Sequence, residues 1–393
     1  MKGWRTFLAA GAFLALSLGA RAQFYQKGTD PGFLHWYSIE TPYYQVIYPS
    51  GADSLAWNYA RLLERFRQRA GYSIGLGPGE LQRRKLPVLL HPFNGYANGS
   101  VSWAPARMDL YTVMSPSGGD PAPWDVQLAA HEPRHQAQLQ IGYTGFLKPL
   151  GYLLGEAASP LGFLLYLDLA LAEGDAVVAE TGFGYGTRAR TADFLDYYRL
   201  ALDQGDFRSW DRWRYGSFKH FTPDYYTLGY LTIGGVRYFY DYPLFTADFL
   251  ARSRRRPFSF TPRNMQKTAA ERAGKPFKAV FSDMLQDLNR QWQEEAAARA
   301  PFLPQEQITH KRRFPRSYSS TRLLDGTLYL IREDQARGKE LVALKDGRET
   351  VLTPLSASVS YISSCPNFRR LYWAETIQDP RWELSHRSVV RYY

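Results

Sequence analysis

The segment at positions 131–135 constrains this chain more than any other part of its sequence. It reads His-Glu-Pro-Arg-His, so two histidines stand four positions apart with a glutamate directly after the first. On an α-helix this spacing places both imidazoles one turn apart on the same face, where they can hold a Zn²⁺ ion while the glutamate acts on a water beside it. We therefore expect a helix here, with His131 and His135 as metal ligands and a further ligand from elsewhere in the chain.

A carboxylate residue, Glu173, follows 38 positions (173 − 135) after the second histidine. Glu173 opens the sequence Glu-Gly-Asp-Ala, within a stretch that reads as a helix. Acidic side chains often orient metal-bound histidines through their second ring nitrogen. Asp175 and Glu180 are the candidates for that role, and Glu180 shares a helical face with Glu173 because it lies seven residues further on.

Pro133 is the one residue of the segment that opposes a helix. Inside a helix it removes one backbone hydrogen bond and costs about 3 kcal/mol relative to a normal helix former. A kink at this position would disturb the convergence of His131 and His135. The proline ring itself points away from them, because two residues at 3.6 per turn correspond to about 200°. We therefore expect metal binding to tolerate Pro133 and catalysis to be the property at risk.

The start of the chain has the pattern of an export signal. A basic pair, Lys2 and Arg5, precedes an apolar run at 7–18, and Ala20-Arg21-Ala22 matches a cleavage site. The run is too short to cross a bilayer, so residues 1–22 are predicted to be a removed signal peptide, which places the protein in the periplasm or outside the cell. The apolar stretch 146–171 is interrupted by two prolines and three charges, and we expect buried helices there instead of a membrane span.

The net charge is +11, and two basic runs stand out, at 252–256 and 311–316. No recognisable nucleic-acid-binding module accompanies them, so we expect no nucleic-acid partner. The runs fit solvated faces, or a patch that meets an anionic envelope. A general polyanion-binding function rests on charge alone and ranks below the other interpretations.

The elements expected around the HExxH segment form a mixed fold. Strands are predicted at 43–48, 86–91 and 107–113, with an amphipathic helix at 52–69 and mostly helices from 124 to about 301. After Pro304 the pattern changes to short strands, with Asp-Gly turns at 325–326 and 346–347 and further strands at 359–362, 370–374 and 388–392. Two units of roughly 40 residues there resemble propeller blades.

The combination of these motifs resembles a known group, the gluzincin-type (peptidase MA-like) metallopeptidases, whose third ligand is the Glu of an E-G-x-A stretch. More narrowly, the chain resembles secreted bacterial proteins that join such a domain to a TolB-like β-propeller, and Asp-Pro-Arg-Trp at 379–382 fits the propeller part. The resemblance implies an α+β fold. A thermolysin-like domain with a small N-terminal sheet and a helical part would span 23–305, and the first propeller blades would span 306–393.

The resemblance also implies residue roles. His131, His135 and Glu173 would hold Zn²⁺, and Glu132 would be the general base. Tyr226, at a Tyr-bearing helix start, is the first choice for a donor to the reaction's oxyanion, with Tyr230 second and His220 a more distant candidate. The chain departs from the family pattern at Pro133, and also at Ala170, where an aromatic residue is usual. An extended peptide would pair with an edge strand formed by 100–104 or by 107–113.

Two functions follow from these patterns. The first is a zinc-dependent peptidase of the cell envelope that acts on a peptide or protein. The alternative is a catalytically inactive peptidase-like protein that binds or scaffolds an envelope partner through its propeller. Pro133 favours the alternative, and the complete set of two His, a base Glu and a distal Glu favours the first.

Overall fold

The computed structural model describes residues 30–76, 84–93, 97–114, 121–184, 186–217, 219–255, 261–304, 306, 308–309, 314–334, 336–378, 380 and 386–393. The predicted signal peptide and the basic residues 311–313 lie outside these ranges. Most of the Asp-Pro-Arg-Trp segment at 379–382 lies outside them as well.

The chain forms two compact units that alternate along the sequence. The first comprises Met1–Asp196 and Tyr225–Val280, and the second comprises Tyr197–Asp224 and Phe281–Tyr393. The HExxH segment and Glu173 both belong to the first unit. Helices and small sheets occur together, as the predicted mixed class requires.

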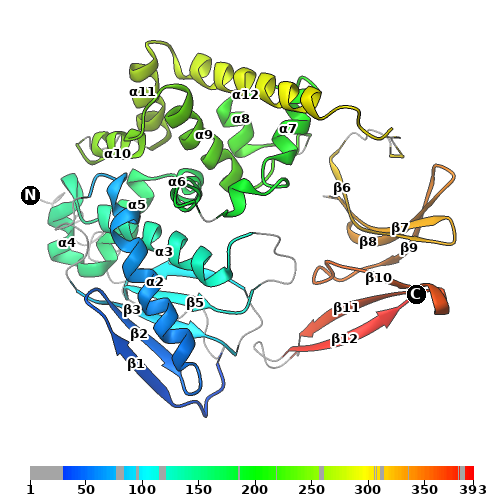
Figure 1. The fold of residues 1–393 in the computed structure, drawn as a ribbon, viewed down its shortest axis with the longest axis horizontal. Coiled ribbons are helices and arrows are strands. Elements are labelled where there is room, and N and C mark those ends of the chain that lie inside the picture. Colours follow the sequence, from blue (N-terminus) through cyan, green and yellow to red (C-terminus); the bar gives the residue numbers. More distant parts are fainter. Residues whose placement is uncertain are drawn as a thin grey trace, which may run out of the picture. The chain divides into compact units, whose positions relative to one another are not determined.

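The first unit contains a five-stranded sheet with the order β1-β2-β3-β5-β4 (Figure 1). Its strands are β1 (Trp36–Glu40), β2 (Tyr44–Pro49), β3 (Leu86–His91), β4 (Gly99–Ser102) and β5 (Arg107–Tyr111). The three central strands run parallel, and β1 and β4 are antiparallel edges. The strands predicted at 43–48, 86–91 and 107–113 are confirmed. The prediction that 107–113 could be an edge strand is wrong, because β5 pairs with β3 on one side and β4 on the other.

Two helices pack on this sheet and share its core. Helix α2 (Asp53–Tyr72) connects β2 to β3, and its buried positions follow the helical spacing, with Tyr59, Leu62, Leu63 and Phe66 on the inner side. Helix α3 (Trp124–Ile141) carries the HExxH segment and adds Leu128 to the same core. Apolar burial therefore fixes the first half of α3 against the sheet beside β4.

The helical part of the first unit follows α3. It consists of α4 (Lys148–Leu154), α5 (Ala158–Tyr166), α6 (Leu169–Gly182), α9 (Tyr225–Phe239), α10 (Phe245–Arg255) and α11 (Thr261–Ala273). Helices α6 and α9 touch through their backbones at Gly174 and Gly229. A Cβ atom at Gly174 would lie 2.0 Å from the carbonyl carbon of Gly229, and only glycine allows this approach.

One prediction for the helical part is wrong. The stretch 146–171 was expected to be buried because it is apolar, but α4 has no buried residue, and the side chains of Tyr152 and Leu153 are 84% and 79% exposed. Helix α5 is buried on one side only, where Ala158, Gly162 and Tyr166 pack inward. Of the helices that the structure describes, none combines the length and apolar character needed to cross a membrane.

The second unit consists of short helices and two antiparallel sheets. Helix α7 (Asp196–Asp203) leads into it, α8 (Trp210–Tyr215) follows, and α12 (Phe277–Arg299) begins in the first unit and ends in the second. One sheet contains β6 (Arg316–Leu324), β7 (Thr327–Asp334), β8 (Gly338–Lys345) and β9 (Arg348–Pro354). The other contains β10 (Ser363–Cys365), β11 (Arg370–Gln378) and β12 (His386–Tyr392).

Most strand predictions for the second unit are confirmed, including both hairpins with Asp-Gly turns. The strand predicted at 359–362 is wrong. Val359 and Ile362 are apolar because they fill the core between the strands as part of an irregular segment, and the short strand β10 begins only at Ser363. The two sheets are open, and within the described residues they close no propeller ring.

Candidate metal centre

The HExxH segment is helical throughout. Helix α3 begins at Trp124 directly after Pro123 and continues through Pro133 to Ile141. Asp125 lies in its first turn, where a negative charge favours the helix dipole. Pro133 does not interrupt the helix, so the two histidines remain one turn apart on one face.

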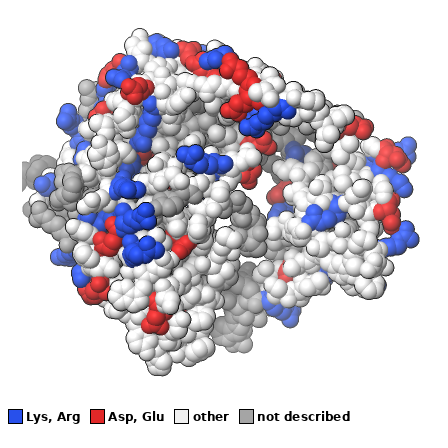
Figure 2. All heavy atoms as spheres, viewed as in Figure 1, with Lys and Arg blue, Asp and Glu red and all other residues white. Residues whose placement is uncertain are grey.

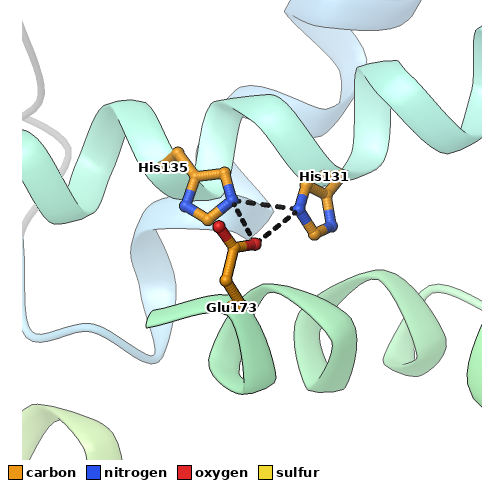
Figure 3. A group of neighbouring side chains, drawn as sticks. All are labelled: His131, His135 and Glu173. Atoms are coloured by element: carbon orange, nitrogen blue, oxygen red, sulfur yellow. Dashed lines mark hydrogen bonds and ion pairs between the residues drawn. The ribbon is translucent and has the colours of Figure 1, made fainter. Parts of the chain in front are cut away.

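Three side chains converge at one point between α3 and α6 (Figure 3). The Nε2 atoms of His131 and His135 are 2.9 Å apart. Oε2 of Glu173 lies 3.1 Å from Nε2 of His135 and 3.4 Å from Nε2 of His131. Among the described residues, this is the one group of His, Cys, Asp and Glu side chains close enough together to hold a metal ion.

The outer ring nitrogen of each histidine is already engaged. Nδ1 of His131 donates to Oε2 of Glu180 at 2.7 Å, since a carboxylate only accepts. Nδ1 of His135 lies 2.8 Å from Oε1 of Gln138. The amide nitrogen of Gln138 donates to the Ala172 carbonyl and to Asp175, which leaves its oxygen to accept from His135.

If both imidazoles are neutral, this pattern leaves the inner atoms without a proton between them. Once each Nδ1 donates, a neutral imidazole has a bare lone pair on Nε2. Two such nitrogens then face each other and the Glu173 carboxylate within 3.4 Å. Three acceptors at this distance repel one another unless an additional proton or a cation lies between them.

The pKa values of these groups reflect the crowding. Burial lowers the pKa of His135, but the charge and hydrogen bond of Glu173 outweigh it and raise the pKa to about 9. Burial would raise the pKa of Glu173, yet His135 and His131 hold it well below its usual range. The site is thus built to keep Glu173 ionised and to attract positive charge.

Glu132 lies beside this cluster in a different environment. Its side chain is buried, and burial raises its pKa, with His131 and His135 opposing the shift. Its Oε2 atom is buried without a hydrogen-bond partner. A Cβ atom at Gly99 of β4 would collide with the carboxylate, so glycine at this position leaves room for Glu132. A buried carboxylate with a free acceptor and a raised pKa is suited to take up a proton.

A cavity of about 480 Å³ opens over the cluster. Edge strand β4 forms one wall, and the HExxH face of α3 forms another. Its apolar lining includes Trp124, Leu128, Leu139, Phe163 and Leu169, and its polar lining includes Arg188 and Tyr226. The size and the mixed lining are those of a site for a small ligand or a short segment of chain.

Of the two residues predicted to orient the histidines, Glu180 contacts one of them and Asp175 does not. Glu180 orients His131, as expected, and Arg188 at the start of the 3₁₀ helix Arg188–Arg190 donates from Nε to its other oxygen at 3.0 Å. The same role for Asp175 is wrong. Its carboxylate is fully buried and accepts two hydrogen bonds from Arg134, at 2.6 and 2.9 Å. It therefore joins α6 to α3 without contacting a ligand histidine.

Of the predicted oxyanion donors, Tyr226 lies at the site. It lines the cavity and forms a side-chain hydrogen bond with Glu173, and burial together with that carboxylate raises its pKa. Tyr230 is not among the residues that line the cavity, and its ring packs edge-on against Phe194. His220 belongs to the second unit, where it is exposed and forms a short bridge with Ser217.

The departure from the family pattern at Ala170 has a packing explanation. Ala170 replaces the usual aromatic residue at a point where it is fully buried and where Gly229 approaches its carbonyl oxygen.

Arg134, Gln138 and Arg188 were not predicted as part of the site. Arg134 and Gln138 lie near the HExxH histidines in sequence, which was the available signal, but their partners on α6 are distant in sequence.

No protein-family model matches this chain, and no curated protein matches it.

Proposed function

We propose that this protein is a zinc-dependent peptidase. The observation that carries the proposal is the meeting of three acceptor atoms, from His131, His135 and Glu173, while both histidines already donate from Nδ1. A divalent cation resolves the repulsion between these atoms. Two imidazole nitrogens and one carboxylate oxygen, with a fourth position open, form a donor set of catalytic zinc sites.

The spacing of the donor atoms supports zinc. Ligands at 2.0–2.1 Å around a tetrahedral ion lie about 3.3 Å from one another. The three distances between the inner atoms are 2.9, 3.1 and 3.4 Å, so small adjustments suffice. Glu180 and Gln138 hold the imidazoles with Nε2 turned inward, as such ligands require.

A bound zinc ion would supply a lowered water pKa and polarisation of the peptide carbonyl. Glu132, with its free buried oxygen, would take the proton from the attacking water and later deliver it to the leaving amine. Tyr226 would donate a hydrogen bond to the carbonyl oxygen as its negative charge develops. These roles require both side chains to line the same cavity, which they do.

The cavity also offers a place for the substrate backbone. Strand β4 is an edge of the sheet, so its outward backbone groups are available to pair with an extended peptide. Gly99, Ser100 and Val101 of this strand line the cavity opposite the HExxH face. Leu139, Phe163 and Leu169 would receive an apolar side chain, and Arg188 would face a polar or anionic group.

The finer classification belongs to the same proposal. A thermolysin-like, gluzincin-type domain is supported by the sheet with an antiparallel edge beside the HExxH helix and by the Glu-bearing helix α6. The predicted signal peptide supports a periplasmic or secreted location. The two open sheets of the second unit are the proposed first blades of a propeller, and an envelope partner would bind there.

Metal analysis combined with a peptide-library digest tests the proposal. We expect about one zinc per chain, lost in His131→Ala and Glu173→Ala but kept in His35→Ala, a control at an exposed histidine. Glu132→Gln should keep zinc and lose at least about 100-fold in cleavage rate, since general-base catalysis contributes 10²–10⁴-fold. Glu333→Gln, at an exposed glutamate, should leave both properties unchanged.

Two results would contradict the proposal. Protein purified without chelators that carries no zinc and binds none on titration would remove the metal centre. Cleavage that persists unchanged in Glu132→Gln would assign the activity to another site. Zinc at full occupancy without cleavage of any peptide would favour the binding or scaffolding alternative.

A further inference from the structure

Helices α4 and α5 present an apolar outer face. Tyr152 and Leu153 on α4 are almost fully exposed, and on α5 the side chain of Leu164 is 70% exposed, with Leu161 less so. Together these side chains expose an area on the order of 500 Å², which is at the upper end for a monomer and usually marks an interaction surface.

Close packing on the inner side of α5 determines which of its side chains are exposed. A Cβ atom at Gly162 would collide with the backbone of Gly142, so the helix sits directly against the end of α3. Ser159 is buried beside it and donates to the carbonyl of Leu139. With these residues turned inward, Leu161 and Leu164 can only point outward. The apolar face is therefore a consequence of tight packing and not of a loosely placed segment.

Cationic side chains border this face. Helix α10 ends in an arginine-rich turn, and it packs against α5 and against the 3₁₀ turn Gly145–Leu147 that opens α4. Gly145 lies directly on the backbone of Arg254. Lys148 begins α4 itself. Figure 2 shows Lys and Arg, with several Asp and Glu among them, over the side of the first unit where Figure 1 places α10 and α11.

A polar cavity of about 690 Å³ lies between α10 and α11. Arg252, Arg255 and Arg272 line it, together with Asp248 and Glu271. Glu271 pairs with Arg252, and Asp248 accepts from Tyr242. Thr268 also lines the cavity, and its buried hydroxyl has no hydrogen-bond partner. Arg272 donates to the backbone carbonyls of Tyr240 and Asp241. Arg255 and the Thr268 hydroxyl are therefore the lining groups that would meet a phosphate first.

We propose that α4, α5 and the C-terminal turn of α10 bind the surface of a bilayer that contains anionic phospholipid. Leucine and tyrosine side chains at 70–84% exposure would enter the interface between headgroups and acyl chains. The bordering Lys and Arg side chains would pair with lipid phosphates, and the arginine-lined cavity would receive a headgroup.

The apolar face of α4 and α5 lies next to the proposed active site, but membrane binding at this face does not require catalytic activity. Helix α5 turns Leu161 and Leu164 outward, while Phe163 of the same helix lines the cavity over the metal centre. A bilayer bound at this face would therefore lie beside one wall of the substrate cavity. Substrates would then be peptides held close to a membrane surface.

Flotation with lipid vesicles tests the proposal. The full chain is mixed with phosphatidylcholine vesicles, with or without phosphatidylglycerol, at low and high salt. We expect the protein to float with the anionic vesicles and to bind the neutral ones at least about tenfold more weakly, with the difference reduced by salt. The double variant Leu153→Glu/Leu164→Glu should lose more than about tenfold in affinity for anionic vesicles.

A matched control separates this face from general hydrophobicity. Leu303→Glu/Leu323→Glu makes the same change at two leucines that are 87% and 70% exposed in the second unit, and it should bind as the wild type does. Arg255→Gln should weaken binding to anionic vesicles only. Far-UV circular dichroism and zinc content should be unchanged in all variants, because every changed side chain is exposed.

The proposal fails if the wild type remains unbound with anionic vesicles, or if both double variants behave alike. Equal binding to neutral and anionic vesicles would overturn the part assigned to the cations. If instead the wild type self-associates and Leu153→Glu/Leu164→Glu makes it monomeric, the face belongs to a second copy of this chain and the bilayer assignment is wrong.

Discussion

Arg134 and Asp175 form a fully buried ion pair with two hydrogen bonds, between the two helices that carry the proposed metal ligands. Arg134 lies inside the HExxH segment, one residue before His135, and Asp175 lies two residues after Glu173. Arg134 also donates to the Ala70 carbonyl at the end of α2. The pair therefore sets the distance between α3 and α6, and with it the spacing of the ligands.

The first prediction concerns this ion pair. Breaking a buried pair leaves an uncompensated charge, so Asp175→Asn should lower the free energy of unfolding of the first unit by about 3–5 kcal/mol. Zinc affinity should fall as well, because α6 loses its anchor on α3. Thermal unfolding and zinc competition measure the two effects. Asp193→Asn, at an exposed aspartate of the same unit, is the control and should change neither.

The second prediction concerns the contact between α6 and α9. Gly174→Ala would force a Cβ atom onto the backbone of Gly229, and backbone cannot move aside as a side chain can. We expect a loss of about 3 kcal/mol, at the upper end for overpacking, with a displaced Tyr226. Gly182→Ala in the same helix meets nothing within 4 Å and should be neutral or slightly stabilising. Equal melting temperatures for the two variants would refute the packing argument.

The third prediction concerns the orientation of His131. Glu180→Gln weakens the hydrogen bond from Nδ1 and leaves Arg188 without its charged partner. Zinc affinity should fall about 10- to 100-fold, as is usual when a residue that orients a ligand is changed. Competition with a chromophoric chelator measures this. A change of less than twofold would mean that Glu180 does not orient the ligand.

The fourth prediction concerns pH. His91 is buried between Asp30 and Asp109, with ring nitrogens 2.7 and 3.1 Å from their carboxylates. Burial lowers its pKa, but the hydrogen bonds that the ring donates to Asp109 and Asp30 more than offset this, so the pKa is raised. Its stabilising contribution is fully present below the unfolded-state value of about 6.5 and is lost as pH rises through the folded-state value.

The melting temperature measured as a function of pH checks this expectation. The wild type should lose stability above about pH 6.5 relative to His91→Gln, which cannot take up the proton. The two curves should therefore converge at alkaline pH. Parallel curves from pH 5.5 to 8.5 would show that His91 does not titrate in this range.

The clustering of the candidate metal ligands was largely predictable because short-range geometry determines it. At 3.6 residues per turn, a four-residue interval places His131 and His135 on one face, and a seven-residue interval places Glu180 on the same face as Glu173, two turns further on. The same geometry explains why Asp175 was misassigned. Two residues after Glu173 is about 200° around the helix, so Asp175 points to another side of α6 and meets Arg134.

Other features depend on contacts that are distant in sequence. Nothing in the local pattern of α4 distinguishes an apolar helix that packs inward from one that faces outward, because Tyr152 and Leu153 would look the same in either case. The close approach of Gly174 and Gly229 likewise requires two segments 55 positions (229 − 174) apart. Helix α3 is continuous through Pro133, and the local sequence does not indicate this outcome, because a proline inside a helix usually kinks or breaks it.

The alternation of the two units along the sequence has a consequence for biosynthesis. Residues 197–224 belong to the second unit, so the part of the first unit that begins with α9 at Tyr225 is synthesised only after them. While the ribosome is still making that stretch, the nascent chain already holds α3 and α6 but lacks Tyr226 and the helix that covers Gly174. Tyr226 would consequently join the candidate metal centre only late in translation, after both helices that carry His131, His135 and Glu173 have been synthesised.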